Sequence, residues 1–412
     1  MEGASPPWET VVGSTEDRID GIDGDFETER VEPVDDIATS TPVLAVCDFS
    51  ANLGKIERHI GPLADTAEPT MVCITADETV DGVDYRTVPD LGWRPISLLC
   101  MFFAAILEAY RGEYEAVVSF SLVPHGCFAL VIGRAFGLPV HLGVIGADLD
   151  VHARARYGTA VAFLLRRFDV VSVPGTTHRR QLLDLGVNPD RTALLSNPID
   201  PGRYRPDPEI ENRYDLLWVG RFDAEKDPIT FVDACAALAE RGVEFRAAMV
   251  GDGPLRSVVE RRLNEIDGRR GTNLRDRIER TGWVEDPLYH YQRGRIFALT
   301  SRRDALPLTL IEAMATGCVP VVAPVGNVRD AAVDGENALV LDSRTPDAFA
   351  EAFATLLSDA ERLERFSQRS SRVRDRYTYA EATEDWQTIL RRLLVERGND
   401  RSLREKTKYP AH

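Results

Sequence analysis

The residues best suited to chemistry lie around a predicted helix start at Pro307. Asp304 precedes this helix on a loop, and Glu312 follows about one turn into it, so both carboxylates could face a single bound ligand. The backbone N–H groups of Leu308 and Thr309, at the positive end of the helix, suit a diphosphate. Carboxylates accept hydrogen bonds from the vicinal hydroxyls of sugars and ribose. The alternative interpretation is that Asp304 is an ordinary loop residue and Glu312 a solvated helix position.

Two cations, Arg221 and Lys226, occur on a loop that we expect between a strand and the following helix. Ligands in open α/β sheets bind outside such strand ends. A guanidinium and an ammonium there would neutralise phosphates and stabilise a departing nucleoside diphosphate without a metal. Pairing with the acidic residues of the same loop is the alternative. A glycine turn that includes Gly251 follows another expected strand, but such turns need no ligand.

Composition excludes several classes of protein. The 412 residues include 66 acidic and 49 basic ones, and the net charge of −17 predicts no nucleic-acid partner. Arginine supplies nearly all the positive charge, which is typical of a halophilic-type acidic surface and also of GC-rich codon usage. The six cysteines are scattered among apolar residues, with no spacing that suits a metal.

The chain shows no pattern typical of secretion or of a membrane span. No basic segment followed by an apolar run occurs at its start, so we expect a cytoplasmic protein. The longest apolar stretch, 96–107, falls short of the ~20 residues that span a bilayer. We expect this stretch to form a buried helix.

Short apolar runs alternate with helix-like stretches and predict an α/β fold with two doubly wound, Rossmann-like sheets. The expected strands are 42–47, 70–75, 116–120, 140–144, 170–173, 214–219, 245–250, 277–282, 296–299 and 319–323, and the clearest helices of the second half are 228–241 and 308–316.

We expect four parts along the chain. Residues 1–41 form an acidic, disordered tail. Residues 42–197 form an N-terminal Rossmann-like acceptor domain, and a linker rich in turn residues leads to a C-terminal Rossmann-like nucleotide-sugar domain at 198–378. Residues 379–412 form a helix that packs back on the first domain, followed by a tail, with Trp386, Ile389, Leu390 and Leu393 on one face.

Several motifs of the second half occur in the order and spacing of glycosyltransferase family four, which the chain resembles over most of residues 196–342. Weaker matches occur in the first half at 54–59, 137–148 and 196–200. The resemblance implies a GT-B fold, in which two Rossmann-like domains face each other across a cleft. The motifs are Gly220-Arg221-Phe222 with Lys226, Val250-Gly251-Asp252-Gly253-Pro254-Leu255, Thr281-Gly282-Trp283-Val284 and the run from Pro307 to Val322.

The resemblance also implies a reaction, namely transfer of a sugar from a nucleotide-diphosphate sugar with retention of anomeric configuration. The donor is a co-substrate, and no metal or other cofactor is implied. Arg221 and Lys226 would bind the diphosphate, Glu312 the ribose, and Asp304 would stand near the transferred sugar. The remaining positions are Leu308, Thr309, Gly251 and Val284 on the donor side and Gly54 on the acceptor side.

Several positions depart from the family pattern. Asp304 is one methylene shorter than the usual Glu, Ala305 replaces a Gly, and Ile145 stands where the family often has His. His125 and Asp148 are the remaining first-domain candidates for catalysis, and a structural role suits each of them as well. In the loop that follows the run, Asn327 and Arg329 replace a common Gly and Pro.

We therefore predict a glycosyltransferase that acts on a glycan or lipid-linked acceptor in cell-surface polysaccharide or glycoconjugate synthesis. Peripheral contact with the inner face of the membrane would suit such an acceptor. A basic helix flanked by Arg154, Arg156, Arg166 and Arg167 could supply this contact, and a solvated helix face is the alternative. Rival hypotheses are a nucleotide-sugar epimerase or glycogen-synthase-like enzyme of the same fold, a catalytically degenerate GT-B partner protein, and a nucleotide-binding regulator.

Overall fold

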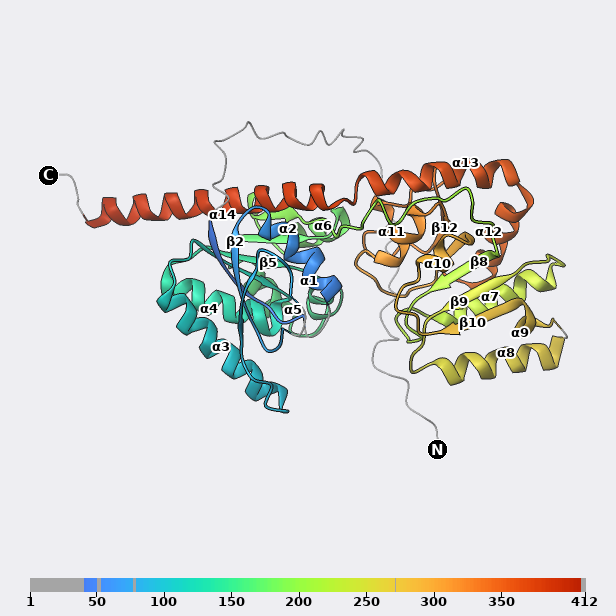
Figure 1. The fold of residues 1–412 in the computed structure, drawn as a ribbon, viewed down its shortest axis with the longest axis horizontal. Coiled ribbons are helices and arrows are strands. Elements are labelled where there is room, and N and C mark those ends of the chain that lie inside the picture. The colour runs from blue at the N-terminus through green and yellow to red at the C-terminus, as the bar shows by residue number, and fades with distance from the viewer. Residues whose placement is uncertain (1–40, 50–52, 77–78, 271, 409–412) are drawn as a thin grey trace. The chain divides into compact units, whose positions relative to one another are not determined.

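The computed structural model describes residues 41–49, 53–76, 79–270 and 272–408 (Figure 1). Apart from Thr41, the predicted acidic tail lies outside these residues. The described chain forms two parallel sheets, each with its own helices, and we call these two units the first and the second lobe. The predicted fold class, two doubly wound Rossmann-like sheets, is confirmed.

The first lobe is built on a seven-stranded sheet in the order β3-β2-β1-β4-β5-β6-β7. Its strands are β1 (Pro42–Val46), β2 (Glu68–Cys73), β3 (Asp84–Thr87), β4 (Ala116–Phe120), β5 (Val140–Gly143), β6 (Val170–Val173) and β7 (Thr192–Leu194). Its helices are α1 (Leu53–His59), α2 (Gly61–Ala64), α3 (Arg94–Arg111), η1 (Leu122–Gly126), α4 (Cys127–Phe136), η2 (Asp148–His152), α5 (Gly158–Leu165), α6 (Thr176–Asp184) and η3 (Pro189–Arg191).

The second lobe is built on a six-stranded sheet in the order β10-β9-β8-β11-β12-β13. Its strands are β8 (Tyr214–Val219), β9 (Ala247–Val250), β10 (Ile278–Gly282), β11 (Gly294–Leu299), β12 (Val319–Val322) and β13 (Leu339–Val340). Its helices are α7 (Pro228–Glu240), α8 (Arg256–Arg270), α9 (Leu274–Arg277), α10 (Leu288–Tyr291), α11 (Leu308–Ala315), η4 (Val328–Asp330), α12 (Pro346–Ser358), α13 (Ala360–Ser370) and η5 (Ser371–Asp375), and α14 (Tyr379–Lys408) then ends the described chain.

Three strands were missed by the sequence analysis, and all three lie at a sheet edge. β3 is largely exposed, and β7 and β13 have three and two residues. Edge strands are buried on fewer sides than central ones, so they need no continuous apolar run that a pattern search would detect.

The long helix α14 completes the core of the first lobe. Trp386, Ile389, Leu390 and Leu393 are fully buried in the cluster that also contains Val43 of β1. The indole N–H of Trp386 donates a hydrogen bond to the carbonyl oxygen of His59 at 3.1 Å. The last helix of the chain therefore packs on elements near its start.

The stretch 96–107 is helical, as predicted, but the prediction that this helix is buried is wrong. The stretch forms most of α3, and Met101, Ala105 and Ala109 on its inner side are buried. On its outer side, Leu99 and Phe103 are 51% and 59% exposed. A helix layer covers one face of a sheet, so only one side of each helix meets the core. None of the described helices is long and apolar enough to cross a bilayer.

The packing of α14 generates a stability prediction. Trp386→Ala should leave a cavity in the first lobe and destabilise it by about 3–5 kcal/mol. Calorimetry should show a lowered unfolding midpoint. Val395→Ala is the matched control, because Val395 lies on the same helix but is 59% exposed, and its midpoint should stay near that of the wild type. Equal midpoints for wild type and Trp386→Ala would contradict this account of the core.

Candidate active site

A cavity of about 410 Å³ lies at the carboxyl ends of both sheets and is lined by residues of both lobes. Ligands in open α/β sheets bind outside the carboxyl ends of the strands, so this cavity is the candidate site. First-lobe residues in its wall include Lys55, His59, Phe120, Ser172 and Asn197, and second-lobe residues include Lys226, Asp304, Ala305, Leu308 and Thr309.

An ion pair between Lys226 and Asp304 forms part of the cavity wall. The Lys226 side chain is 28% exposed and that of Asp304 15% exposed. The loop after β8 positions the lysine, because the carboxylate of Asp223 accepts a hydrogen bond from the backbone N–H of Lys226 at 2.9 Å. The two side chains predicted to contact the donor diphosphate and the donor sugar therefore neutralise each other in this structure.

The amino end of α11 reaches the same cavity through Leu308 and Thr309. Pro307 precedes the helix in an extended conformation, and no side chain caps this end. The N–H groups of Leu308 and Thr309 and the helix dipole thus remain available to an anion beside Lys226, whereas the N–H of Leu310 donates to the Pro307 carbonyl oxygen at 3.0 Å.

Glu312 is half-buried in a polar cluster and is absent from the cavity wall. Its carboxylate accepts a hydrogen bond from the Tyr291 hydroxyl at 3.0 Å. Burial raises the pKa of Glu312, while the hydrogen bond from Tyr291 and the positive charge of Arg58 act in the opposite direction. Arg58 belongs to α1, so residues of both lobes surround this carboxylate.

The other predicted donor residues hold or flank the loops around the cavity. Arg221 is exposed, and its guanidinium lies 3.8 Å from the Asp223 carboxylate. Gly251 has a φ of +134°, and a Cβ there would lie 2.0 Å from the Gly220 carbonyl oxygen, so only glycine fits. Val284 is half-buried against the core of the second lobe.

The two first-lobe candidates for catalysis lie outside the cavity wall. Asp148 accepts a hydrogen bond from the Leu122 N–H at 3.0 Å and so links the loops after β4 and β5. Burial raises the pKa of Asp148 and lowers that of His125. Gly54, the acceptor-side candidate, lies in α1, where a Cβ would come within 3.3 Å of the Arg58 guanidinium.

Sequence reasoning missed two polar residues of the cavity wall, His59 and Asn197. The Nδ1 of His59 and the Oδ1 of Asn197 are buried and have no hydrogen-bond partner among the described residues, and the same is true of Arg58 Nε. Burial lowers the pKa of His59 to about 3, so its ring is neutral. Unpaired buried polar atoms are rare in native proteins, so those of His59 and Asn197 are candidates for contact with a ligand or water in this cavity. The segment 54–59 had signalled this region, but only Gly54 was selected from it.

Asn327, singled out only as a departure from the family pattern, joins the two lobes. Its backbone N–H and side-chain N–H donate to the Ala305 carbonyl oxygen at 2.7 and 3.1 Å. Its Oδ1 accepts from the backbone N–H of His178 at 3.0 Å, and its Nδ2 lies 3.1 Å from the His178 Nδ1. If Nδ1 accepts, Nε2 carries the proton and donates to Asp150 at 3.3 Å.

Asp330 adds a second contact between the lobes, at the amino end of α6. Its carboxylate accepts from the backbone N–H of Thr176 at 2.7 Å and from the Thr176 hydroxyl at 2.5 Å. A carboxylate at this position also interacts favourably with the helix dipole. Together with Asn327, Asp330 fixes the loop after β12 against the first lobe.

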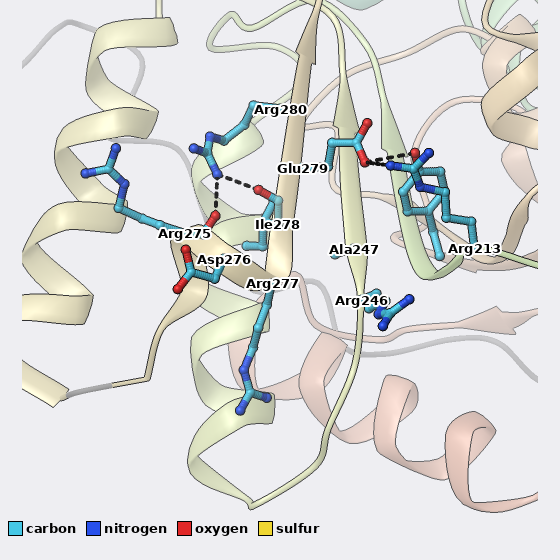
Figure 2. A pocket seen from close by; sticks show the side chains of 10 residues that line it. Arg213, Arg246, Ala247, Arg275, Asp276, Arg277, Ile278, Glu279 and Arg280 are labelled. Carbon is cyan, nitrogen blue, oxygen red and sulfur yellow. Dashed lines mark hydrogen bonds and ion pairs between the residues drawn. The ribbon is translucent and has the colours of Figure 1, made fainter.

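A larger hollow of about 610 Å³ lies in the second lobe, as Figure 2 shows. It is lined by the first residues of β8, β9 and β10, at the sheet edge opposite the candidate site. Its arginines are largely paired, for example Arg213 with Glu279 at 2.8 Å and Arg277 with Glu244 at 2.9 Å. We therefore assign the site to the smaller cavity. Among the described residues, no group of His, Cys, Asp or Glu side chains is placed to hold a metal.

The two parallel Rossmann-like lobes with a cavity at their carboxyl edges define the GT-B class. The structure of Anabaena Alr3699/HepE with UDP-glucose aligns with a TM-score of 0.69 at 16% identity, over 85% of this chain and 99% of that chain. At this level of identity the alignment shows the fold.

Sequence comparison finds similarity to glycosyltransferases in the second half of the chain. Residues 213–359 match the family described as glycosyl transferases group 1, in the half of the chain that contains the four motifs. It is 32% identical to the alpha-D-kanosaminyltransferase of Streptomyces kanamyceticus over 172 residues, which are 40% of this chain and 43% of that relative. It is 27% identical to the D-inositol 3-phosphate glycosyltransferase of Frankia alni over 70% of this chain and 78% of that relative. The chain thus spans less than half the length of the first of these relatives.

The contact made by Asn327 generates the second prediction. Asn327→Ala removes one hydrogen bond to Ala305 and leaves buried groups of His178 without partners, at a cost of about 1–3 kcal/mol. Backbone hydrogen exchange around 176–178 and 304–305 should become about 5- to 150-fold faster. Asn337→Ala is the control, because the Asn337 side chain bonds only within its own loop, to Val333 and Ala331. Equal exchange rates in both variants would show that Asn327 does not hold the lobes together.

Proposed function

We propose that this protein is a glycosyltransferase that moves a sugar from a nucleotide-diphosphate sugar to an acceptor hydroxyl, with retention of configuration. The observation that carries the proposal is the ion pair of Lys226 and Asp304 beside the uncapped amino end of α11, in a cavity lined by both lobes. A cation, free backbone N–H groups and a carboxylate at one place suit a diphosphate next to a polyhydroxylated sugar.

Donor binding would exchange partners in this ion pair. Diphosphate oxygens at the amino end of α11 would draw the ammonium of Lys226 away from Asp304. The carboxylate of Asp304 would then accept hydrogen bonds from hydroxyls of the transferred sugar. Arg221 is exposed, and its contact with Asp223 is loose at 3.8 Å. Its guanidinium can therefore turn toward the outer phosphate.

The transfer step follows from this arrangement. The bond between the anomeric carbon and the diphosphate oxygen breaks, and the acceptor oxygen forms the new bond on the same face of the sugar. The acceptor proton passes to the departing phosphate oxygen. Lys226 and the amino end of α11 stabilise the negative charge that develops on this leaving group. Because these protein groups stabilise the leaving group, the proposal assigns no step to a metal or another cofactor.

The acceptor is proposed to be a glycan or a lipid-linked molecule, and the setting is cell-surface polysaccharide or glycoconjugate synthesis in the cytoplasm. The first lobe would bind this acceptor, since Lys55, His59 and Ser172 line the cavity opposite the donor groups. The unpaired Nδ1 of the neutral His59 ring is the polar atom best placed to bind a hydroxyl there.

Donor binding to Lys226→Gln is the direct test. Calorimetry of UDP-, GDP- and ADP-sugars should identify one donor that binds wild type, and the loss of a charge-assisted hydrogen bond should weaken it about 10- to 150-fold in the variant. Arg262→Gln is the matched control, because it removes a cation from another ion pair of the same lobe, with Asp233 at 2.6 Å. NMR of the product should show the anomeric configuration of the donor.

Two results would overturn the proposal. A wild-type protein that binds no donor at all would exclude a nucleotide-sugar enzyme. Donor binding that depends on Lys226 but yields neither transfer nor slow hydrolysis with any acceptor would favour the degenerate partner protein. Such a partner protein would retain the ion pair between Lys226 and Asp304 that this structure contains.

The raised pKa of Glu312 predicts opposite pH effects on binding and stability. Donor affinity should fall as pH decreases through this raised pKa, because a protonated Glu312 accepts hydrogen bonds from ribose less well. Its contribution to the stability of the free protein is full below the unfolded pKa and is lost as pH rises through the folded one. Both effects should disappear in Glu312→Gln. Parallel pH profiles of donor affinity for wild type and Glu312→Gln would show that Glu312 does not bind the ribose.

A further inference from the structure

The larger hollow of the second lobe is rich in arginine, and we call it the arginine hollow. Ten residues around the starts of β8, β9 and β10 line it. The chain has 49 basic residues among 412, so ten residues would include about one at random. The lining includes five, which are Arg213, Arg246, Arg275, Arg277 and Arg280. The composition of the chain does not account for this concentration.

The lining of the arginine hollow has a positive net charge. It includes two acids, Asp276 and Glu279, against the five arginines, so its net charge is +3. Glu279 already accepts hydrogen bonds from Arg213 at 2.8 Å and from the Tyr214 hydroxyl at 3.1 Å. At physiological salt, charges are screened beyond about 8 Å. A small molecule in the hollow would therefore experience this local charge more than the −17 of the whole chain.

Two of the five guanidinium groups make no ion pair within the described part of the chain. Arg246 is exposed, and its guanidinium makes no contact with the other residues drawn in Figure 2. Arg275 is also exposed, and it donates a hydrogen bond to the neutral side-chain amide of Asn264 at 2.5 Å. Arg280 lies beside it, because its guanidinium donates to the Arg275 carbonyl oxygen at 2.9 Å. The charges of Arg246 and Arg275 therefore remain available to an anion.

Two further arginines of the hollow pair with acids that lie outside its lining. Arg277 pairs with Glu244 at 2.9 Å, and the Glu244 side chain is 83% exposed. Arg280 pairs with Glu260 at 3.1 Å. Ion pairs at a protein surface contribute little to stability, because water solvates both partners. Replacing such a carboxylate with an oxyanion of a ligand therefore costs little.

We propose that the arginine hollow binds a small molecule that carries two or more phosphate groups. A planar guanidinium donates two parallel hydrogen bonds to one phosphate, so several arginines around one hollow suit several phosphates. The volume of about 610 Å³ lies within the range of sites for small molecules. A long polyanion fits less well, because it would extend beyond the hollow along a chain whose net charge repels it.

The arginine hollow is separate from the candidate active site. It lies at the amino ends of its strands, whereas Lys226 and the cavity lie beyond the carboxyl end of β8. The six residues of β8 span about 20 Å. A phosphorylated ligand in the hollow could thus bind together with a nucleotide sugar, and the inference does not depend on the proposed transfer.

Calorimetry of the full chain with inorganic tripolyphosphate tests the arginine hollow. Wild type should bind tripolyphosphate at least about tenfold more tightly than monophosphate, which engages fewer arginines. Arg246→Gln/Arg275→Gln should weaken tripolyphosphate binding at least about tenfold, because charge-assisted hydrogen bonds are lost. Asp276→Asn should strengthen it about two- to fivefold, because a like charge is removed. Arg365→Gln/Arg372→Gln, which changes two exposed arginines of the same lobe outside the hollow, is the matched control and should bind as wild type does.

Three results would overturn the proposal. The first is a wild type that binds no tripolyphosphate, and the second is equal weakening in the two double-arginine variants, which would indicate unspecific attraction. The third is a loss of tripolyphosphate binding in Lys226→Gln, which would place the ligand in the candidate active site. Unchanged binding in Lys226→Gln supports the hollow even where no nucleotide sugar binds. Unfolding midpoints near that of wild type should show that the variants with changed exposed residues are folded.

A comparison with ATP distinguishes two sources of the phosphate groups. ATP that binds more tightly than tripolyphosphate, and that loses affinity in Arg246→Gln/Arg275→Gln, would identify a nucleotide as the ligand. Tighter binding of tripolyphosphate with the same dependence on the two arginines would identify an inorganic oligophosphate. ATP and tripolyphosphate affinities that both ignore these arginines would contradict the assignment of the hollow.

Discussion

The parallel direction of every strand pair is the constraint on which the site depends. In a parallel sheet all carboxyl ends lie at one edge, so loops distant in sequence meet there. Lys226 follows β8, Asp304 follows β11, and His59 closes the helix after β1. The close approach of Gly251 to the Gly220 carbonyl shows how tightly two of these loops pack, since a Cβ would clash. No single motif could assemble this cavity by itself.

Central strands and the loop-to-helix motifs were predictable because burial on both faces demands continuous apolar runs, and phosphate sites demand a helix start. Side-chain partners were not predictable. Glu312 is one turn into α11, as expected, but its neighbours Tyr291 and Arg58 come from other elements. The sequence analysis missed the exposure of Phe103. The spacing of apolar residues predicts a helix, but it does not tell which side of the helix other elements cover. Asn327 contacts a residue 149 positions earlier, His178, which no local pattern encodes.

The charged side chains in and next to the cavity interact with partners, although Arg58 Nε makes no hydrogen bond to a described residue. Lys226 neutralises Asp304, and Arg58 and Tyr291 support Glu312. Isolated buried charges are costly, so a binding site without its ligand must pair its own charges. The neutral atoms behave differently, because His59 Nδ1 and Asn197 Oδ1 stay unpaired at a smaller cost. In the proposed donor complex the charged groups would exchange partners, whereas the neutral ones would gain their first.

Ala305 joins the ion pair to the contact between the lobes. Its carbonyl oxygen accepts both hydrogen bonds from Asn327, and its neighbour Asp304 contacts Lys226. Gly146 of the first lobe lies against the same residue, where a Cβ would come within 2.8 Å of the Ala305 Cβ. A ligand that draws Lys226 away from Asp304 would therefore act next to the residue that carries this contact. If the proposed donor binding changes the contact between the lobes, then by linkage a change in that contact alters donor affinity by the same factor.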